Sequence, residues 1–133
     1  MPIEVTPSAE ELDELHDDLK SYEAKLAAYL SSDASQNDPN YTSLAKTDIQ
    51  LNLQIYNLST AQLQLAGANA GAAVDAINSA VGNLKATFET KSMIEKDLDI
   101  AQSAVAFVVA LLTQNPSAIV STGGEFVNRL KAA

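Results

Sequence analysis

Hydrophobic residues in the first third of the chain recur at alternating steps of three and four, the spacing of one face of an α-helix in a heptad pattern. The stripe comprises Leu12, Leu15, Leu19, Tyr22, Leu26 and Tyr29. Pro7 and Ser8 suit a helix entrance, so a first helix is predicted from about residue 8. It ends at residues 31–40, where Ser, Asp, Asn and Pro gather and predict a surface loop.

The middle of the chain carries two apolar stripes. The first keeps heptad spacing through Ile49, Leu53, Tyr56, Thr60, Leu63, Gly67, Ala70, Val74, Ile77, Val81, Leu84 and Phe88. The second lies beside its early part and comprises Leu44, Leu51, Ile55, Leu58 and Leu65. Alternation over residues 49–55 would also suit a strand, but the Gln and Asn between the apolar residues favour a helix. Because this helix is apolar on two faces, we expect it to be buried between more than two neighbours.

Small residues interrupt the first stripe at Gly67, Ala70 and Gly71. The glycines either end the helix, or they let it run on at about 1 kcal/mol each while a partner helix approaches its backbone closely. The heptad phase is kept across them, so both interpretations stay open. Residues 41–90 form either one long helix or two.

A further stripe follows in the C-terminal third: Ile94, Leu98, Ala101, Val105, Val108 and Leu112. A capping-box match at Ser92 and Glu95 suggests a turn before it, and Gln114-Asn115-Pro116 is typical of a helix end. A short last helix over residues 117–131 is expected to be weakened at Gly123–Gly124. The patterns predict one all-α domain over residues 1–133, an up-down helical bundle of about four main helices plus a short C-terminal helix.

Two polar residues occupy the second stripe where an apolar residue would fit, namely Asp48 and Gln62. A buried polar residue lowers stability unless it is hydrogen-bonded, and it can fix the register or the choice of partner. The alternative is that the stripe reaches solvent at these positions. We interpret Asp48 and Gln62 as candidate register-setting residues, with Gly67, Ala70 and Gly71 as candidates for close helix contact.

The formal net charge is −9, and residues 1–48 hold eleven acids against three Lys. The negative electrostatic field of these acids repels phosphate groups, so nucleic acid is not an expected partner. The lack of Cys removes disulfides, thiolate catalysis and Cys-based zinc sites together. The N-terminal residues have neither a basic nor an apolar signal region, which predicts a cytoplasmic protein or one exported by a signal-less route.

Candidate chemistry is sparse. His16 is the single histidine, and its place beside the first stripe favours a solvated surface position over a metal ligand. No Gly-x-Ser-x-Gly turn occurs, and Ser121-Thr-Gly-Gly124 lacks the Lys of a phosphate-binding loop. The sequence therefore predicts no enzyme, no cofactor and no metal site.

Two long segments, Ile49–Val74 and Ile100–Gly124, contain no charged residue. The first holds too many Gln and Asn for a membrane span, and the second is apolar without interruption only over residues 104–112. Shielded core helices are the favoured explanation of both gaps. The alternative is conditional exposure of residues 100–124 to a membrane or partner, through Val105, Phe107, Val108, Leu111 and Leu112.

The heptad-patterned faces thus predict a non-enzymatic, coiled-coil-like protein that acts in protein–protein interaction or self-assembly. Its expected partner is another protein or a second copy of the same chain in a homo-oligomer. The alternative function is that of a membrane-active helical protein, pore-forming or secreted and toxin-like, that uses the charge-free segment 100–124.

Overall fold

The computed structural model describes residues 4–5, 9–60, 65–66, 69–90 and 97–132. Five α-helices make up most of this described part, which confirms the all-α prediction. They are α1 (Ala9–Leu30), α2 (Tyr41–Thr60), α3 (Ala70–Thr90), α4 (Leu98–Thr113) and α5 (Pro116–Ala132). They match the predicted four main helices plus a C-terminal one, and at 17 residues α5 is about as long as α4 with its 16.

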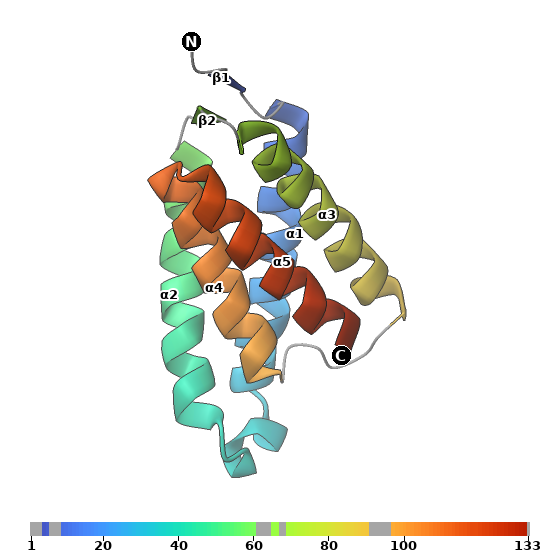
Figure 1. Ribbon diagram of the computed structural model, residues 1–133. Coiled ribbons are helices and arrows are strands. Elements are labelled where there is room, and N and C mark those ends of the chain that lie inside the picture. Colours follow the sequence, from blue (N-terminus) through green and yellow to red (C-terminus); the bar gives the residue numbers. More distant parts are fainter. Residues whose placement is uncertain (1–3, 6–8, 61–64, 67–68, 91–96, 133) are drawn as a thin grey trace.

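Successive helices alternate in direction along the bundle (Figure 1). In space, α1 packs on α2, α2 on α4, α4 on α5, α5 on α3, and α3 returns to α1. This closed order places α2 at one side of the molecule, with α1 and α4 as its main neighbours. The closed order encloses a single hydrophobic core.

The stripe of α1 faces this core as predicted. Leu15, Leu19, Tyr22 and Leu26 are fully buried, and Tyr29 is nearly so. The predicted loop contains a short 3-10 helix, η1 (Asp33–Asn37). The Tyr29 hydroxyl donates a 2.6 Å hydrogen bond to the Asp38 carboxylate, which also accepts the Asn40 backbone N–H at 2.8 Å. These bonds tie the end of α1 to the loop that leads into α2.

The middle of the chain forms two helices, because α2 ends at Thr60 and α3 begins at Ala70. Between them, strand β2 (Leu65–Ala66) pairs antiparallel with strand β1 (Glu4–Val5). Extended backbone at β2 is incompatible with the continuous-helix interpretation. The Thr60 hydroxyl also donates to the Asn57 carbonyl at 3.0 Å in the last turn of α2, a local bond that competes with helix continuation.

The junction between α4 and α5 is the predicted helix end. Gln114 adopts a left-handed backbone with φ of 58°, and Pro116 occupies the first position of α5. The Asn115 side chain accepts hydrogen bonds from the backbone N–H groups of Ser117 and Ala118 at 3.1 and 3.2 Å.

The start of α4 is capped by Asp97, whose carboxylate accepts a hydrogen bond from the Ile100 N–H at 3.2 Å. The capping-box residues Ser92 and Glu95 lie outside the described residues.

The predicted weakness at Gly123–Gly124 is wrong, because α5 runs through both glycines. Gly123 is buried where α5 meets α4, and a Cβ added there would lie 2.9 Å from Cε1 of Phe107. The Phe107 ring in turn stacks on Phe126, with 5.9 Å between ring centroids. Close packing against α4 therefore holds this part of α5 helical despite the low helix propensity of glycine.

Helix α4 is the most apolar of the helices and buries half of its residues: Ile100, Ala101, Ser103, Ala104, Phe107, Val108, Ala110 and Leu111. Its position between α2 and α5 supplies neighbours on two sides. Burial in the core thus accounts for the absence of charge in the α4 part of segment 100–124.

Candidate interaction surface

Helix α2 has one buried face, and it is the second of the two predicted stripes. Leu44, Leu51, Ile55 and Leu58 are all at most 6% exposed. The first stripe points the other way, with Ile49, Leu53 and Tyr56 exposed by 70, 56 and 67%. The prediction that both apolar faces of this helix are buried is therefore wrong for α2, because the face with Ile49, Leu53 and Tyr56 is exposed. The physical reason is that α1 and α4 cover the same side of α2 and leave the opposite side to solvent.

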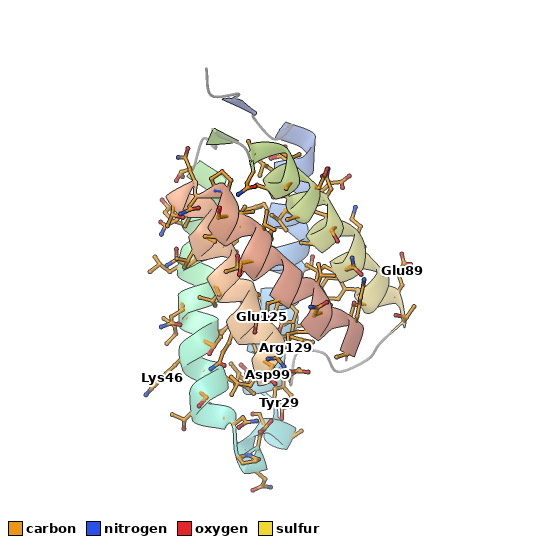
Figure 2. All side chains as sticks on the ribbon, viewed as in Figure 1. Tyr29, Lys46, Glu89, Asp99, Glu125 and Arg129 are labelled. Atoms are coloured by element: carbon orange, nitrogen blue, oxygen red, sulfur yellow. The ribbon has the colours of Figure 1, made fainter. Side chains whose placement is uncertain are left out.

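The outer face of α2 is defined here as Thr42, Lys46, Ile49, Leu53, Tyr56 and Thr60, every one of which is exposed. These residues follow steps of four and three, so they form a regular heptad pattern along about five turns of the helix surface. The Lys46 side chain extends away from the bundle at one end of this face (Figure 2). Tyr41, 39% exposed, lies at the start of the same helix.

The outer face carries no carboxylate. Helix α2, which is described throughout, has two charged residues, Lys46 and Asp48. Asp48 is turned toward α1, because its carboxylate Oδ1 is buried and it interacts with Glu23. Burial therefore explains the lack of charge only on the inner face of residues 49–60, because Ile49, Leu53 and Tyr56 are exposed and apolar.

The contact between α1 and α2 contains a pair of carboxyl groups. Glu23 Oε2 and Asp48 Oδ1 are buried and accept no hydrogen bond from an N–H or hydroxyl donor. Burial, and then the neighbouring Asp48 carboxylate, raise the pKa of Glu23 above its ordinary value. Burial also raises the pKa of Asp48, and a hydrogen bond from Glu23 acts in the opposite direction. Burial at the same helix contact is therefore the main cause of both raised pKa values.

Asp48, the first candidate register-setting residue, thus lies at a helix contact inside the bundle. Ala70 is buried at the start of α3. Gly71 is exposed, and a Cβ added there would meet nothing within 4 Å, so no helix of the bundle approaches it closely. Within the bundle, a tightly packed glycine is found at Gly123. Gln62 and Gly67 lie outside the described residues.

The five candidates for membrane or partner contact all belong to α4. Phe107, Val108 and Leu111 are fully buried, whereas Val105 and Leu112 are partly buried against the core. Exposing them would require α4 to separate from α2 and α5. No helix in the described ranges combines the length and hydropathy of a membrane span.

A small polar hollow lies between α4 and α5. It has a volume of about 200 Å³ and is lined in part by Asp99, Glu125 and Arg129. The Arg129 guanidinium lies 3.7 Å from the Asp99 carboxylate and 3.5 Å from that of Glu125 (Figure 2). Its charge is therefore already paired, and the volume is below the usual range of small-molecule sites.

His16 lies beside Asp17, with 3.5 Å between Nδ1 and Oδ1. Among the residues that the structure describes, no group of three or more His, Asp or Glu side chains is placed to hold a metal ion.

Sequence reasoning missed the outer face of α2 as a surface, although both stripes were visible. Heptad spacing identifies an apolar face but not which of two faces meets the core. The better signal was the distribution of amide side chains: Gln50, Asn52 and Asn57 flank the first stripe, and such polar neighbours suit a solvated surface more than a core.

Comparison with protein-family models, with curated proteins and with solved structures finds no match to the chain. The fold and the surface together define a five-helix bundle with an exposed heptad face on α2.

Proposed function

We propose that the protein is a non-enzymatic helical bundle that acts in protein–protein interaction or assembly through the outer face of α2. The observation that carries the proposal is the exposure of Ile49, Leu53 and Tyr56 on one face. Together these side chains form an apolar patch on the order of 400 Å², the size at which patches on monomeric proteins are often functional. Tyr at such a position also favours an interface, since it brings a large contact area with few rotatable bonds.

The patch is dispensable for the bundle itself. Leu44, Leu51, Ile55 and Leu58 already hold α2 against its neighbours from the opposite face. Three large apolar side chains that are each more than half exposed contribute little to folding and raise the risk of aggregation. A role in binding explains why they stand in heptad register on a surface.

Site-specific photo-crosslinking in the native cell tests the proposal. A photoreactive phenylalanine analogue at Leu53 is compared with the same group at Asn78, an exposed position on α3. The expected result is a discrete covalent protein adduct from position 53 and none from position 78. The proposal fails if position 53 gives no adduct, or if both positions give the same smear of products.

A further inference from the structure

We infer that the partner of the outer face of α2 is a second copy of this chain, with the two α2 helices packed antiparallel in a reversible dimer. The inference rests on the proposed function and names the partner of the same surface. Three observations support it: the distribution of charge, the heptad register and the area of the patch.

Charge selects the face. Two copies that each carry −9 repel one another over most of their surfaces, and eleven of the acids lie within residues 1–48. The outer face of α2 has no carboxylate and one cation, Lys46, so two such faces meet without acid–acid repulsion. An anionic membrane would be repelled by the net charge, and a basic partner would be drawn to the acids of α1 rather than to α2.

Register selects the orientation. Steps of four and three assign Lys46 and Leu53 to a positions and Ile49 and Tyr56 to d positions of one heptad repeat. In a parallel pair, Lys46 would face Lys46 of the second copy in a shared layer. In an antiparallel pair, a positions meet d positions, so Leu53 packs on Ile49 of the second copy. Lys46 then lies against Tyr56 of the second copy, where its stem covers the ring and its ammonium group favours the π face.

Area sets the strength. Helix α2 has 20 residues and is about 30 Å long. Its apolar patch supplies about half of the roughly 800 Å² per partner found in stable complexes. The expected dimer is therefore weak, with a dissociation constant on the order of tens of micromolar rather than nanomolar.

Sedimentation equilibrium of the purified full chain, from about 1 µM to about 1 mM, measures the association. The wild-type mass should rise from 14.0 kDa toward twice that value as the concentration increases. Leu53→Glu should weaken the association at least about tenfold, because it places a carboxylate in the central apolar layer. Asn78→Glu adds the same charge on α3 and should leave it unchanged. Ile49→Gln changes the same layer at a position that is 70% exposed, and it should also weaken the association although it adds no charge.

Engineered disulfides test the orientation, because the chain has no Cys of its own. Ile49→Cys and Leu53→Cys proteins are mixed, oxidised and mapped by peptide mass spectrometry. Antiparallel packing should give mainly 49–53 disulfides between copies, since only residues close in space can be bridged. Dominant 49–49 and 53–53 products would overturn the antiparallel arrangement.

Self-pairing is wrong if the wild type stays monomeric at the highest concentration, or if Leu53→Glu and wild type associate equally. Adducts between position 53 and a different protein in the cell, together with a monomeric purified chain, would overturn the dimer and leave the proposed function standing. Co-sedimentation with neutral or anionic vesicles at low concentration, abolished by Leu53→Glu, would instead assign the face to a membrane and overturn both.

Discussion

Gly123 of α5 lies directly against the ring of Phe107 in α4, so that a Cβ on this glycine would come within 2.9 Å of Cε1 and 3.2 Å of Ala76 Cβ. The ring cannot move away freely, because it is fully buried and stacked on Phe126. Three helices, α3, α4 and α5, therefore meet at a point that only glycine fits.

Gly123→Ala should destabilise the bundle by about 1–2 kcal/mol, since the overpacking outweighs the gain in helix propensity. The matched control is Gly124→Ala one residue later, where an added Cβ meets nothing within 4 Å. That substitution should stabilise α5 by up to about 1 kcal/mol. Urea unfolding of the three proteins measures both effects, and equal changes at the two glycines would contradict the packing at Gly123.

Leu51 and Leu53 are two residues apart on α2 but face opposite sides, with exposures of 0 and 56%. Leu51→Ala should therefore destabilise the monomer by about 2–5 kcal/mol, because it leaves a cavity in the core. Leu53→Ala should change the free energy of unfolding by less than about 0.5 kcal/mol. Thermal and urea unfolding at low micromolar protein compare them, and a large effect of Leu53→Ala there would mean that the outer face is covered within the monomer.

The helices with a single apolar stripe were predictable, because periodicity alone fixes which residues of α1 face the core. Leu15, Leu19, Tyr22 and Leu26 fall on one side whatever the neighbouring helices are. The turn at residues 114–116 was predictable for a local reason as well, since Pro and Asn act on the backbone beside them.

Helix α2 was predictable as a helix but not in its orientation. Two stripes, one through Leu51 and one through Leu53, satisfy the heptad pattern equally well. The choice between them depends on where α1 and α4 pack, which is a tertiary relationship between segments far apart in the chain. The same limit applies to Gly123, whose neighbour Phe107 comes from another helix, and to Asp48, whose partner Glu23 is on α1.

The bond between the Tyr29 hydroxyl and the Asp38 carboxylate predicts a local effect on stability. Tyr29→Phe removes the donor from a 2.6 Å hydrogen bond to a charged acceptor and keeps the buried ring. We expect a loss of about 1–2 kcal/mol in the free energy of unfolding. Tyr41→Phe, at an exposed tyrosine on α2, is the control and should be neutral. Equal stabilities of the two variants in denaturant titrations would contradict a contribution from the Tyr29 bond.

The carboxyl pair of Glu23 and Asp48 makes stability depend on pH in a defined direction. The pKa of each group is raised in the folded protein, first by burial, and burial also raises the pKa of Asp18. Above about pH 4, carboxyl groups of the unfolded chain are ionised, whereas these three groups still hold protons in the folded state. The free energy of unfolding should therefore fall as the pH rises through the raised folded pKa values, and the contribution of this pair is fully present only below about pH 4, where the unfolded chain is protonated as well.

Asp48→Asn removes one carboxyl group and gives Glu23 an amide donor in its place. Its free energy of unfolding should fall less steeply between about pH 4 and pH 7 than that of the wild type, with a residual slope from Glu23 and Asp18. At neutral pH the variant should be more stable than the wild type by less than about 1 kcal/mol, since both carboxyl groups are partly screened by solvent.

Asp75→Asn, at an exposed position on α3, is the control and should keep the wild-type slope. Urea titrations across this range measure the slopes, and a wild-type slope in Asp48→Asn would rule out the pair as the source of the pH dependence. Asp48 would then sit at the α1–α2 contact without an electrostatic role, and its presence in the second stripe would have to be explained by local packing alone.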